Sequence, residues 1–355
     1  MVTIEEQILA VEKEIRETPY NKSTEHHIGK LRAKISRLKD RALDVQTRSS
    51  GGGGGYAVKK QGDATVVLVG PPSAGKSTLL NALTNAESKV APYAFTTVSV
   101  VPGMMKYNDA YIQILDVPGL IEGAEAGKGR GREVLSVVRG SDLLIFLSDV
   151  DRPEAVARIR AALEKNGIRV DQQRPDVSVD KKLSGGVGIK TNLHLAFSRE
   201  TVREIAWEMG VKNAEISIRE RVTLEQLIDV FSKNRVYIPS ITVLNKADTA
   251  TSQPLPDALY VSAEKEEGLE VLRELIWEKL KLVKIYLVKL DEKPSANNPF
   301  IAKEGDALKK VLETLGTEMA ELKTKAQIWG TGAKFPGQKV SLSTKVKEGM
   351  MVRFI

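Results

Sequence analysis

Apolar residues recur along the chain in two patterns, and the change from one pattern to the other divides it into regions. Residues 1–48 carry apolar side chains at helical spacing in two stretches, separated by the turn-forming sequence PYNKSTE, which predicts an N-terminal helical hairpin. Farther along, short β-branched apolar runs alternate with helical segments. The runs expected to form buried strands are TVVLVG, AYIQILD, DLLIFLSD and VYIPSITVLN. This alternation predicts an α/β domain with a mostly parallel sheet.

The same patterns set the expected domain boundaries. Residues 49–62 contain five consecutive glycines and are expected to form a linker, because such a run cannot hold a helix or strand without a large entropic cost. The α/β alternation covers residues 63–165 and 236–282. Between them, residues 166–235 contain helical segments and a glycine- and lysine-rich stretch, which predicts an inserted α+β subdomain. Residues 283–355 combine strand-like runs with one capped helix and are expected to form a further small α+β domain.

Composition restricts the chemistry more than the fold. The 355 residues include no cysteine and only three histidines, which excludes disulfides, a thiol nucleophile and Cys-ligated zinc, and disfavours a histidine-based metal centre. We expect a cytoplasmic protein with no membrane partner, because no apolar run reaches the length of a span and the N-terminus is not signal-like. The net charge of +7 is compatible with RNA. The basic second helix is equally well interpreted as a solvated face or as a nucleic-acid contact.

The sequence GPPSAGKS lies between an expected strand and an expected helix, the context in which G-x-x-x-x-G-K-[ST] indicates a phosphate-binding loop. Backbone N–H groups at the start of the helix form an anion nest, and Gly75 lets phosphate approach the backbone closely. Lys76 is expected to reach the β- and γ-phosphates, and Ser77 to bind Mg²⁺. The residues expected to line this part of the site are Gly70, Pro71, Pro72, Ser73, Ala74, Gly75, Lys76, Ser77 and Thr78.

Two segments are expected to respond to the γ-phosphate. In DVPG, residues 116–119, Asp116 is expected to bind the Mg²⁺ shell and the Gly119 amide to sense the γ-phosphate. The residues between them, Val117 and Pro118, are expected to contact the nucleotide as well. In PYAFTTVSVVPG, Thr97 is favoured over Thr96 as a further Mg²⁺ ligand, the alternative being an ordinary strand threonine. The expected catalytic residues are therefore Lys76, Thr97 and Gly119, and the expected Mg²⁺ ligands are Ser77, Thr97 and Asp116.

Two later motifs predict recognition of guanine. In NKAD, the Asp248 carboxylate can accept hydrogen bonds from N1–H and the 2-amino group of guanine, and adenine offers neither donor. Asn245 is expected to support the base site, and the Lys246 stem to cover the purine. In VSAEK, Ser262 and Ala263 are expected to complete the pocket, with the Ala263 amide near guanine O6. All these motifs follow apolar runs, and strand ends are where such sheets bind ligands.

Several runs of the sequence resemble those of a known family. The runs FTTVSVVPG, DVPGLIEGAEAGKGRGREVLSVVRGSD and NRVYIPSITVLNKAD look like those of the developmentally regulated GTP-binding proteins, a branch of the Obg group. The segment NKSTEHHIGKLRAKISRL is similar to that family's opening hairpin, and KIYLVKL, AQIWG and GQKVSLSTKVKEGMMVRFI are similar to its C-terminal β-grasp (TGS) domain. The resemblance implies a P-loop GTPase that associates with ribosomes and RNA in translation and works with a stabilising partner protein. We expect the chain to be a monomer when alone.

Leu120 poses a chemical problem, because it follows Gly119 at the position where a glutamine would orient the attacking water. The resemblance implies that an apolar residue is normal there, and we expect slow intrinsic hydrolysis. The missing function could come from K⁺, from a partner, or from a side chain such as Glu122, Arg130 or Arg132, although the two arginines are more typical of a solvated or RNA-facing basic loop. A second class of function stays open: an RNA- or ribosome-binding assembly protein in which GTP is mainly structural.

Overall fold

The computed structural model describes residues 3–49, 61–84, 100–117, 130–249, 255–289, 291–316 and 323–355. The chain forms two compact units, which we call unit 1 and unit 2. Unit 1 comprises residues 1–55 and 167–237, and unit 2 comprises residues 56–166 and 238–355. The N-terminal hairpin and the insert, which the sequence predicts as separate domains, therefore share one unit. The α/β segments and the C-terminal domain share the other.

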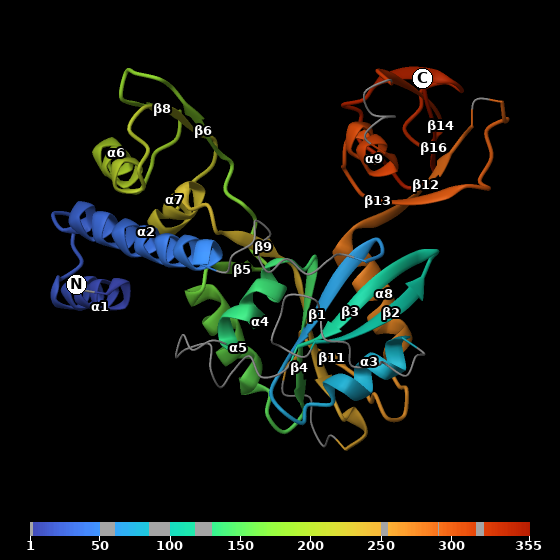
Figure 1. Cartoon of the computed structure of the whole chain (residues 1–355), viewed down its shortest axis with the longest axis horizontal. Coiled ribbons are helices and arrows are strands. Elements are labelled where there is room, and N and C mark those ends of the chain that lie inside the picture. Colours follow the sequence, from blue (N-terminus) through green and yellow to red (C-terminus); the bar gives the residue numbers. More distant parts are fainter. Residues whose placement is uncertain are drawn as a thin grey trace. The chain divides into compact units, whose positions relative to one another are not determined.

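A six-stranded sheet forms the centre of unit 2 (Figure 1). Its strands, in sheet order, are β11 (Leu259–Tyr260), β10 (Ser240–Asn245), β4 (Leu143–Asp149), β1 (Ala64–Val69), β3 (Ala110–Asp116) and β2 (Val101–Tyr107). All neighbouring strands are parallel except β2 and β3. Both β1 and β4 are buried along their whole length, as expected for central strands covered on both faces. The predicted mostly parallel sheet is confirmed.

Helices cover both faces of this sheet. They are α3 (Lys76–Thr84), α4 (Arg130–Arg139), α5 (Glu154–Lys165) and α8 (Leu269–Leu280). Leu80 of α3 and Ile276 of α8 belong to the same buried cluster as Val66 of β1, so α3 and α8 lie on one face. Side chains alternate along a strand, so Phe146 of β4 points to the other face. There the Arg160 guanidinium of α5 lies 5.1 Å from the Phe146 ring centre.

The run VYIPSITVLN forms two strands instead of the single strand that its apolar pattern predicts. β9 (Val236–Ile238) pairs with β5 (Ile168–Val170), whereas β10 begins after Pro239 and joins the six-stranded sheet. Proline has no backbone N–H and cannot donate to a neighbouring strand. Pro239 therefore separates the two ladders, and its carbonyl oxygen accepts a hydrogen bond from the Leu144 N–H at 3.0 Å.

A second, five-stranded sheet forms the C-terminal part of unit 2. Its strands, in sheet order, are β13 (Pro299–Lys303), β12 (Leu282–Leu287), β16 (Met350–Phe354), β14 (Lys325–Gly330) and β15 (Gln338–Ser341). β12 and β16 are parallel, and the other neighbours are antiparallel. Leu308 and Val311 of α9 (Leu308–Leu315) are buried in the core of this sheet. The apolar pattern does not predict β15, whose sequence QKVS contains a single strongly apolar residue.

The C-terminal sheet is joined to the six-stranded sheet by apolar packing and by two ion pairs. Leu282 of β12 belongs to the buried cluster beneath α3 and α8. The Lys284 ammonium lies 2.6 Å from the Asp109 carboxylate in the turn between β2 and β3. The Lys303 ammonium lies 2.7 Å from Asp142, whose other carboxylate oxygen accepts from the Thr65 N–H at 3.0 Å. Lys284 and Lys303 lie at the same end of the β12–β13 pair, so that end is tied to the turn before β3 and to the loop before β4.

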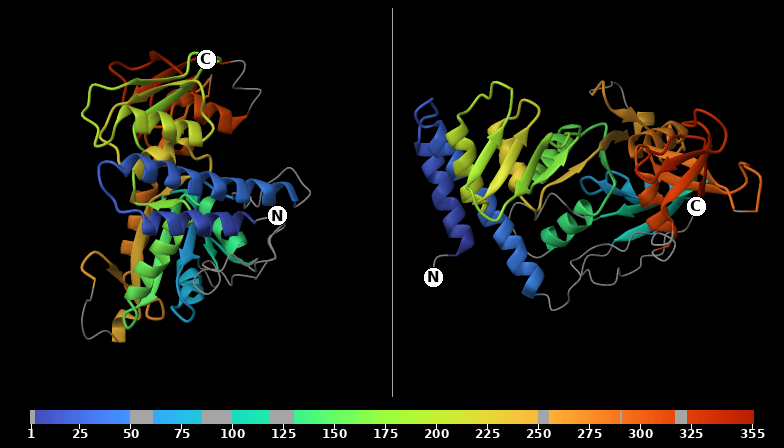
Figure 2. Two further views of the ribbon diagram at one scale, coloured as in Figure 1. Left: turned by 90° about the vertical axis from the view of Figure 1, so that its left-hand side faces the viewer. Right: turned by 90° about the horizontal axis from the view of Figure 1, so that it is seen from above.

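Unit 1 combines the N-terminal hairpin with the insert. Its helices and its three-stranded sheet are α1 (Ile4–Glu17), α2 (Glu25–Ser49), α6 (Arg199–Glu208), α7 (Leu224–Phe231), β6 (Val177–Lys181), β8 (Ala214–Ile218) and β7 (Val187–Lys190). Figure 2 shows α1 and α2 side by side as an antiparallel hairpin. Ala33 of α2 is buried in the same core as Val202 of α6 and Leu227 of α7. The apolar side of α2 is therefore covered by the insert.

A buried ionic cluster fixes α2 to the insert. The Asp229 carboxylate on α7 accepts from Arg169 Nε and from Arg235 Nε, each at 2.5 Å, and its side chain is only 4% exposed. Arg235 also donates to Ser36 Oγ of α2 at 2.9 Å, and that hydroxyl lies 2.7 Å from Ser232 Oγ. A buried carboxylate is tolerated when charged partners satisfy it. The cluster connects α2, α7 and the β5–β9 pair.

Candidate nucleotide-binding site

The phosphate loop leaves β1 and turns directly into α3. At its start, Gly70 passes so close to β4 that a Cβ on it would meet the Leu147 carbonyl oxygen at 2.1 Å. Gly75 has a φ of 84°, in the left-handed region that favours glycine, and a Cβ there would meet Asn245 Nδ2 at 2.2 Å. Both glycines of the motif are therefore required by the packing around the loop. The loop ends at a helix N-terminus, where free N–H groups favour anions.

The Lys76 ammonium folds back over the loop. It donates hydrogen bonds to the Gly70 carbonyl at 3.2 Å and to the Pro71 carbonyl at 3.0 Å. Burial lowers the pKa of Lys76, and the nearby Asp116 carboxylate opposes that shift. An ammonium donates more strongly to an anion than to a neutral carbonyl, so a phosphate would compete well for these contacts.

Asp116, the last residue of β3, lies beside the start of α3. Ser77 Oγ donates to its Oδ2 atom at 2.7 Å. Its Oδ1 atom is buried and has no hydrogen-bond partner among the described residues. A buried polar atom without a partner is costly, whereas Mg²⁺ takes carboxylate, hydroxyl and water oxygens as ligands. The arrangement of Ser77 and Asp116 therefore fits a magnesium ion.

Asn245 joins the phosphate loop to the expected guanine-binding loops. Its Nδ2 atom donates to the Ala74 carbonyl at 3.1 Å, and its Oδ1 atom accepts from the Ala263 N–H at 3.0 Å. The residue is 3% exposed. Its amide orientation is fixed, because one end must donate and the other must accept. Beyond the predicted support of the base site, Asn245 thus also holds the phosphate loop.

Asp248 lies in η1 (Ala247–Thr249), directly after β10. A hydrogen bond from Ser262 holds the pKa of Asp248 below its ordinary value despite some desolvation, and the Lys265 ammonium, 3.3 Å away, acts in the same direction. The Asp248 side chain is 18% exposed. An ionised carboxylate can only accept hydrogen bonds, which is what N1–H and the 2-amino group of guanine require.

Two charged residues outside the predicted set lie beside these loops. Asp149 ends β4, and its carboxylate lies 2.5 Å from Arg152 Nη2 and 3.7 Å from Lys246 Nζ. Arg152 Nη2 also donates to the Pro72 carbonyl of the phosphate loop at 3.4 Å. The sequence signal for Asp149 is its position at the carboxyl end of an apolar strand, where the motif residues also lie.

Part of the predicted site lies outside the described residues. The positions concerned are Thr97, Pro118, Gly119, Leu120 and Glu122. α4 begins at Arg130, but the side chains of Arg130 and Arg132 are likewise not described. Of the remaining predicted residues, Val117 is buried, whereas Ser73 and Thr78 are exposed. The roles assigned to all of these residues stay predictions.

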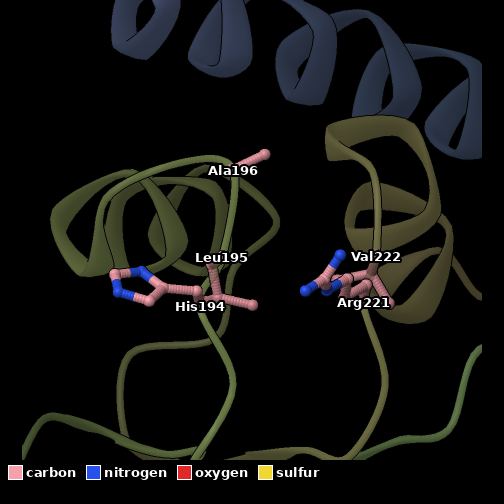
Figure 3. A pocket seen from close by; sticks show the side chains of 5 residues that line it. All are labelled: His194, Leu195, Ala196, Arg221 and Val222. Atoms are coloured by element: carbon pink, nitrogen blue, oxygen red, sulfur yellow. The ribbon is translucent and has the colours of Figure 1, made fainter.

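A separate cavity of about 300 Å³ lies in unit 1 (Figure 3). It is lined by His194, Leu195, Ala196, Arg221 and Val222. Figure 3 shows the His194 ring directed away from the Arg221 guanidinium, so the two side chains do not form a joint catalytic or ligand-binding pair. None of the motif residues lines this cavity, and it adds nothing to the candidate nucleotide site.

Comparison with known proteins gives two family matches along the chain. The family MMR_HSR1, described as 50S ribosome-binding GTPase, matches residues 65–181. A second family, described as the C-terminal region of the MMR_HSR1 domain, matches residues 184–282. An uncharacterized GTP-binding protein of Methanocaldococcus jannaschii is 45% identical over 365 residues, which cover 99% of this chain and 93% of the relative. Developmentally-regulated GTP-binding protein 2 of Homo sapiens is 35% identical, with 99% and 98% covered. The solved YchF GTPase of Schizosaccharomyces pombe aligns with a TM-score of 0.45 and 14% identity, over 84% of this chain and 99% of that chain.

Proposed function

Because this chain belongs to the family of developmentally regulated GTP-binding proteins, we propose that it is a guanine-nucleotide switch that hydrolyses GTP to GDP and phosphate. The observation that carries this proposal is that three motif segments lie at the same edge of the central sheet. The phosphate loop, Asp116 and the NKAD motif lie at the carboxyl ends of β1, β3 and β10, and Asn245 hydrogen-bonds to the phosphate loop and to the VSAEK loop. Open α/β sheets bind ligands at this edge.

In this proposal each residue has a role that follows from its chemistry. The N–H groups of residues 73–77 and the Lys76 ammonium hold the β- and γ-phosphates. Ser77 and Asp116, together with Thr97, would hold Mg²⁺, which when bound neutralises charge on the phosphates. Asp248 accepts hydrogen bonds from the guanine edge. ATP lacks these donors and would leave the carboxylate unpaired, so the site selects GTP.

Hydrolysis by the chain alone is slow in this proposal, because Leu120 cannot orient the attacking water. The Gly119 amide would contact the γ-phosphate, but positioning the water falls to K⁺, to a side chain such as Glu122, Arg130 or Arg132, or to a partner protein. A Leu120→Gln variant separates these cases. A large gain in turnover would show that water orientation is the missing contribution, and no gain would mean that the loop geometry itself differs.

We further propose that the switch acts in translation, in the cytoplasm, on ribosomes and RNA, together with a stabilising partner protein. The ribosome-binding description of the matching family and the net charge of +7 support this role. The five-stranded C-terminal sheet with α9 packed on it supports its assignment as a β-grasp (TGS) domain. A second candidate, an RNA-binding assembly protein with structural GTP, is favoured by a cationic cavity of about 370 Å³ in unit 1. That cavity is lined by Lys34, Arg37, Leu38, Arg41 and Glu208.

The test is to measure the affinity of the full chain for ribosomes, and separately for RNA, with a non-hydrolysable GTP analogue and with GDP. A switch requires different affinities in the two nucleotide states, because a ribosome or RNA that binds both states equally cannot shift the equilibrium between them. We expect the two affinities to differ by about ten-fold or more. Equal affinity for both states would favour the assembly protein. Binding of neither ribosomes nor RNA in either state would contradict both candidates.

A further inference from the structure

The turn between β4 and α5, residues 149–153, is held in one conformation by its own hydrogen bonds. Ser148 Oγ, fully buried, donates to the Arg152 carbonyl at 2.7 Å, and the Arg152 N–H donates to the Asp149 carbonyl at 3.2 Å. β4 lies between β1 and β10 in the sheet. The turn therefore emerges between the phosphate loop that follows β1 and the NKAD loop that follows β10.

The Asp149 carboxylate lies close to two cations, Arg152 in the same turn and Lys246 in the NKAD loop. Arg152 Nε lies 3.2 Å from both carboxylate oxygens, and Arg152 Nη2 lies 2.5 Å from Oδ2. Lys246 Nζ lies 3.7 Å from the same Oδ2 atom. The Asp149 side chain is 5% exposed, whereas those of Arg152 and Lys246 are 42% and 47% exposed. A buried anion thus anchors two cations that extend towards the surface.

The same cluster reaches the phosphate loop. Arg152 Nη2 donates to the Pro72 carbonyl at 3.4 Å in addition to its contact with Asp149. One buried carboxylate therefore links the residue expected to cover the purine with the backbone expected to hold the phosphates. Lys246 itself has a φ of 62°, in the left-handed region, and its side chain ends at the Asp149 carboxylate.

We propose that Asp149 is a positioning residue for nucleotide binding, which holds the Lys246 stem over the purine position and, through Arg152, holds the phosphate loop at Pro72. This inference rests on the proposed function, in which Lys246 covers the base. The lysine stem is long and flexible, and ordering it only when ligand arrives costs affinity. A carboxylate that orders it beforehand removes part of that cost. Asp149 is not expected to touch the nucleotide.

The test is the rate at which a fluorescent GDP analogue dissociates from full-length Asp149→Asn, with the affinities for GDP and inosine diphosphate. We expect dissociation to quicken by about ten-fold, the effect of one charge-assisted hydrogen bond. The ratio of GDP to inosine diphosphate affinity should stay as in the unaltered chain, because inosine lacks only the 2-amino group, which Asp248 reads. Asp248→Asn should instead reduce that ratio. Asp151→Asn, an exposed carboxylate in the same turn, is the matched control and should leave both quantities unchanged.

Coupling to Lys246 separates positioning from a general loss of stability. In a Lys246→Ala background, Asp149→Asn should speed dissociation by much less than it does in the unaltered chain. If the two effects multiply fully, or if Asp149→Asn dissociates GDP at the unaltered rate, the inference is wrong while the proposed function stands. If the unaltered chain binds neither diphosphate, both fail. Should Asp149→Asn not fold, Arg152→Lys takes its place: it keeps the charge, loses the two-pronged contact, and should quicken dissociation in the same direction.

Discussion

Single buried polar atoms organise the candidate site. The Asn245 amide satisfies one carbonyl of the phosphate loop and one N–H of the VSAEK loop, and the second oxygen of Asp116 is buried with no partner in the part of the chain that the structure describes. The first arrangement stabilises the loops before any ligand binds. The second leaves an acceptor that a cation can use. Stability and cation binding therefore depend on different residues of the site.

We expect Asn245→Ala to lower the free energy of unfolding, because the Ala74 carbonyl and the Ala263 N–H would both lose their partner in the interior. Each buried group left without a hydrogen bond costs about 1–3 kcal/mol, so the loss for the two groups should be about 2–6 kcal/mol. Chemical denaturation without nucleotide measures it. Asn297→Ala, at an exposed asparagine of the same unit, should change stability by less than about 0.5 kcal/mol. Equal effects of the two substitutions would contradict the role given to Asn245.

At the scale of elements, unit 1 depends on contacts between segments far apart in the chain. The Asp229 cluster joins α7 to β5, β9 and α2, and its carboxylate is buried between two arginines. Removing one partner of a buried ion pair leaves an uncompensated charge, which costs far more than losing an exposed pair.

Asp229→Asn should therefore destabilise unit 1 by about 3–5 kcal/mol, because Arg169 and Arg235, whose side chains are only 16% and 11% exposed, would both lose the carboxylate that they share. Asp176→Asn gives the matched comparison, since the Asp176–Arg219 pair is about 60% exposed on both side chains. That substitution should cost at most about 1 kcal/mol. Urea unfolding followed by far-UV circular dichroism measures both. A loss at Asp229 no larger than the loss at Asp176 would show that the cluster does not hold the unit together.

The elements that the sequence predicts well are those whose signal is local. β1, β3 and β4 are short apolar runs, and the motif residues stand directly after them, so both the strands and the end of the sheet that carries the site follow from the pattern. Pro239 is a local signal too, but the predicted single strand follows the apolar residues on either side of it, whereas in the structure the missing N–H separates β9 from β10. The cluster of Ser36 with Ser232 joins residues 196 positions apart, and no local pattern reports such a contact. The contacts of Asp149 with Lys246 and of Arg152 with Pro72 escape prediction for the same reason, because those partners lie in loops far away in the sequence.

At the scale of the whole molecule, the C-terminal sheet is connected to the strands that carry the nucleotide motifs. The turn between β2 and β3 separates the expected first switch loop from DVPG, and Lys284 of the C-terminal sheet binds Asp109 in that turn. A hydrogen bond with Lys284 lowers the pKa of Asp109, and the same bond raises the pKa of Lys284.

The pair should therefore stabilise unit 2 over a defined pH range. A lowered carboxyl pKa contributes stability that is full above the ordinary value of 3.8 and is lost as the pH falls through the folded-state value. A raised ammonium pKa contributes stability that is full below 10.5 and is lost as the pH rises through the folded-state value. A double-mutant cycle of Asp109→Ala and Lys284→Ala should show favourable coupling at neutral pH and none well below pH 3.8. Coupling that persists in acid would assign the contact to packing instead of charge.

The central claim is that these loops bind and hydrolyse GTP in preference to ATP. Its most direct test is phosphate release by the full chain from GTP and from ATP, in the presence of Mg²⁺ and K⁺, with Lys76→Ala as the inactive control. The account predicts slow release from GTP, little or none from ATP, and loss of the GTP activity in the Lys76→Ala variant. Equal rates with the two nucleotides, or a rate with GTP that Lys76→Ala leaves unchanged, would contradict it.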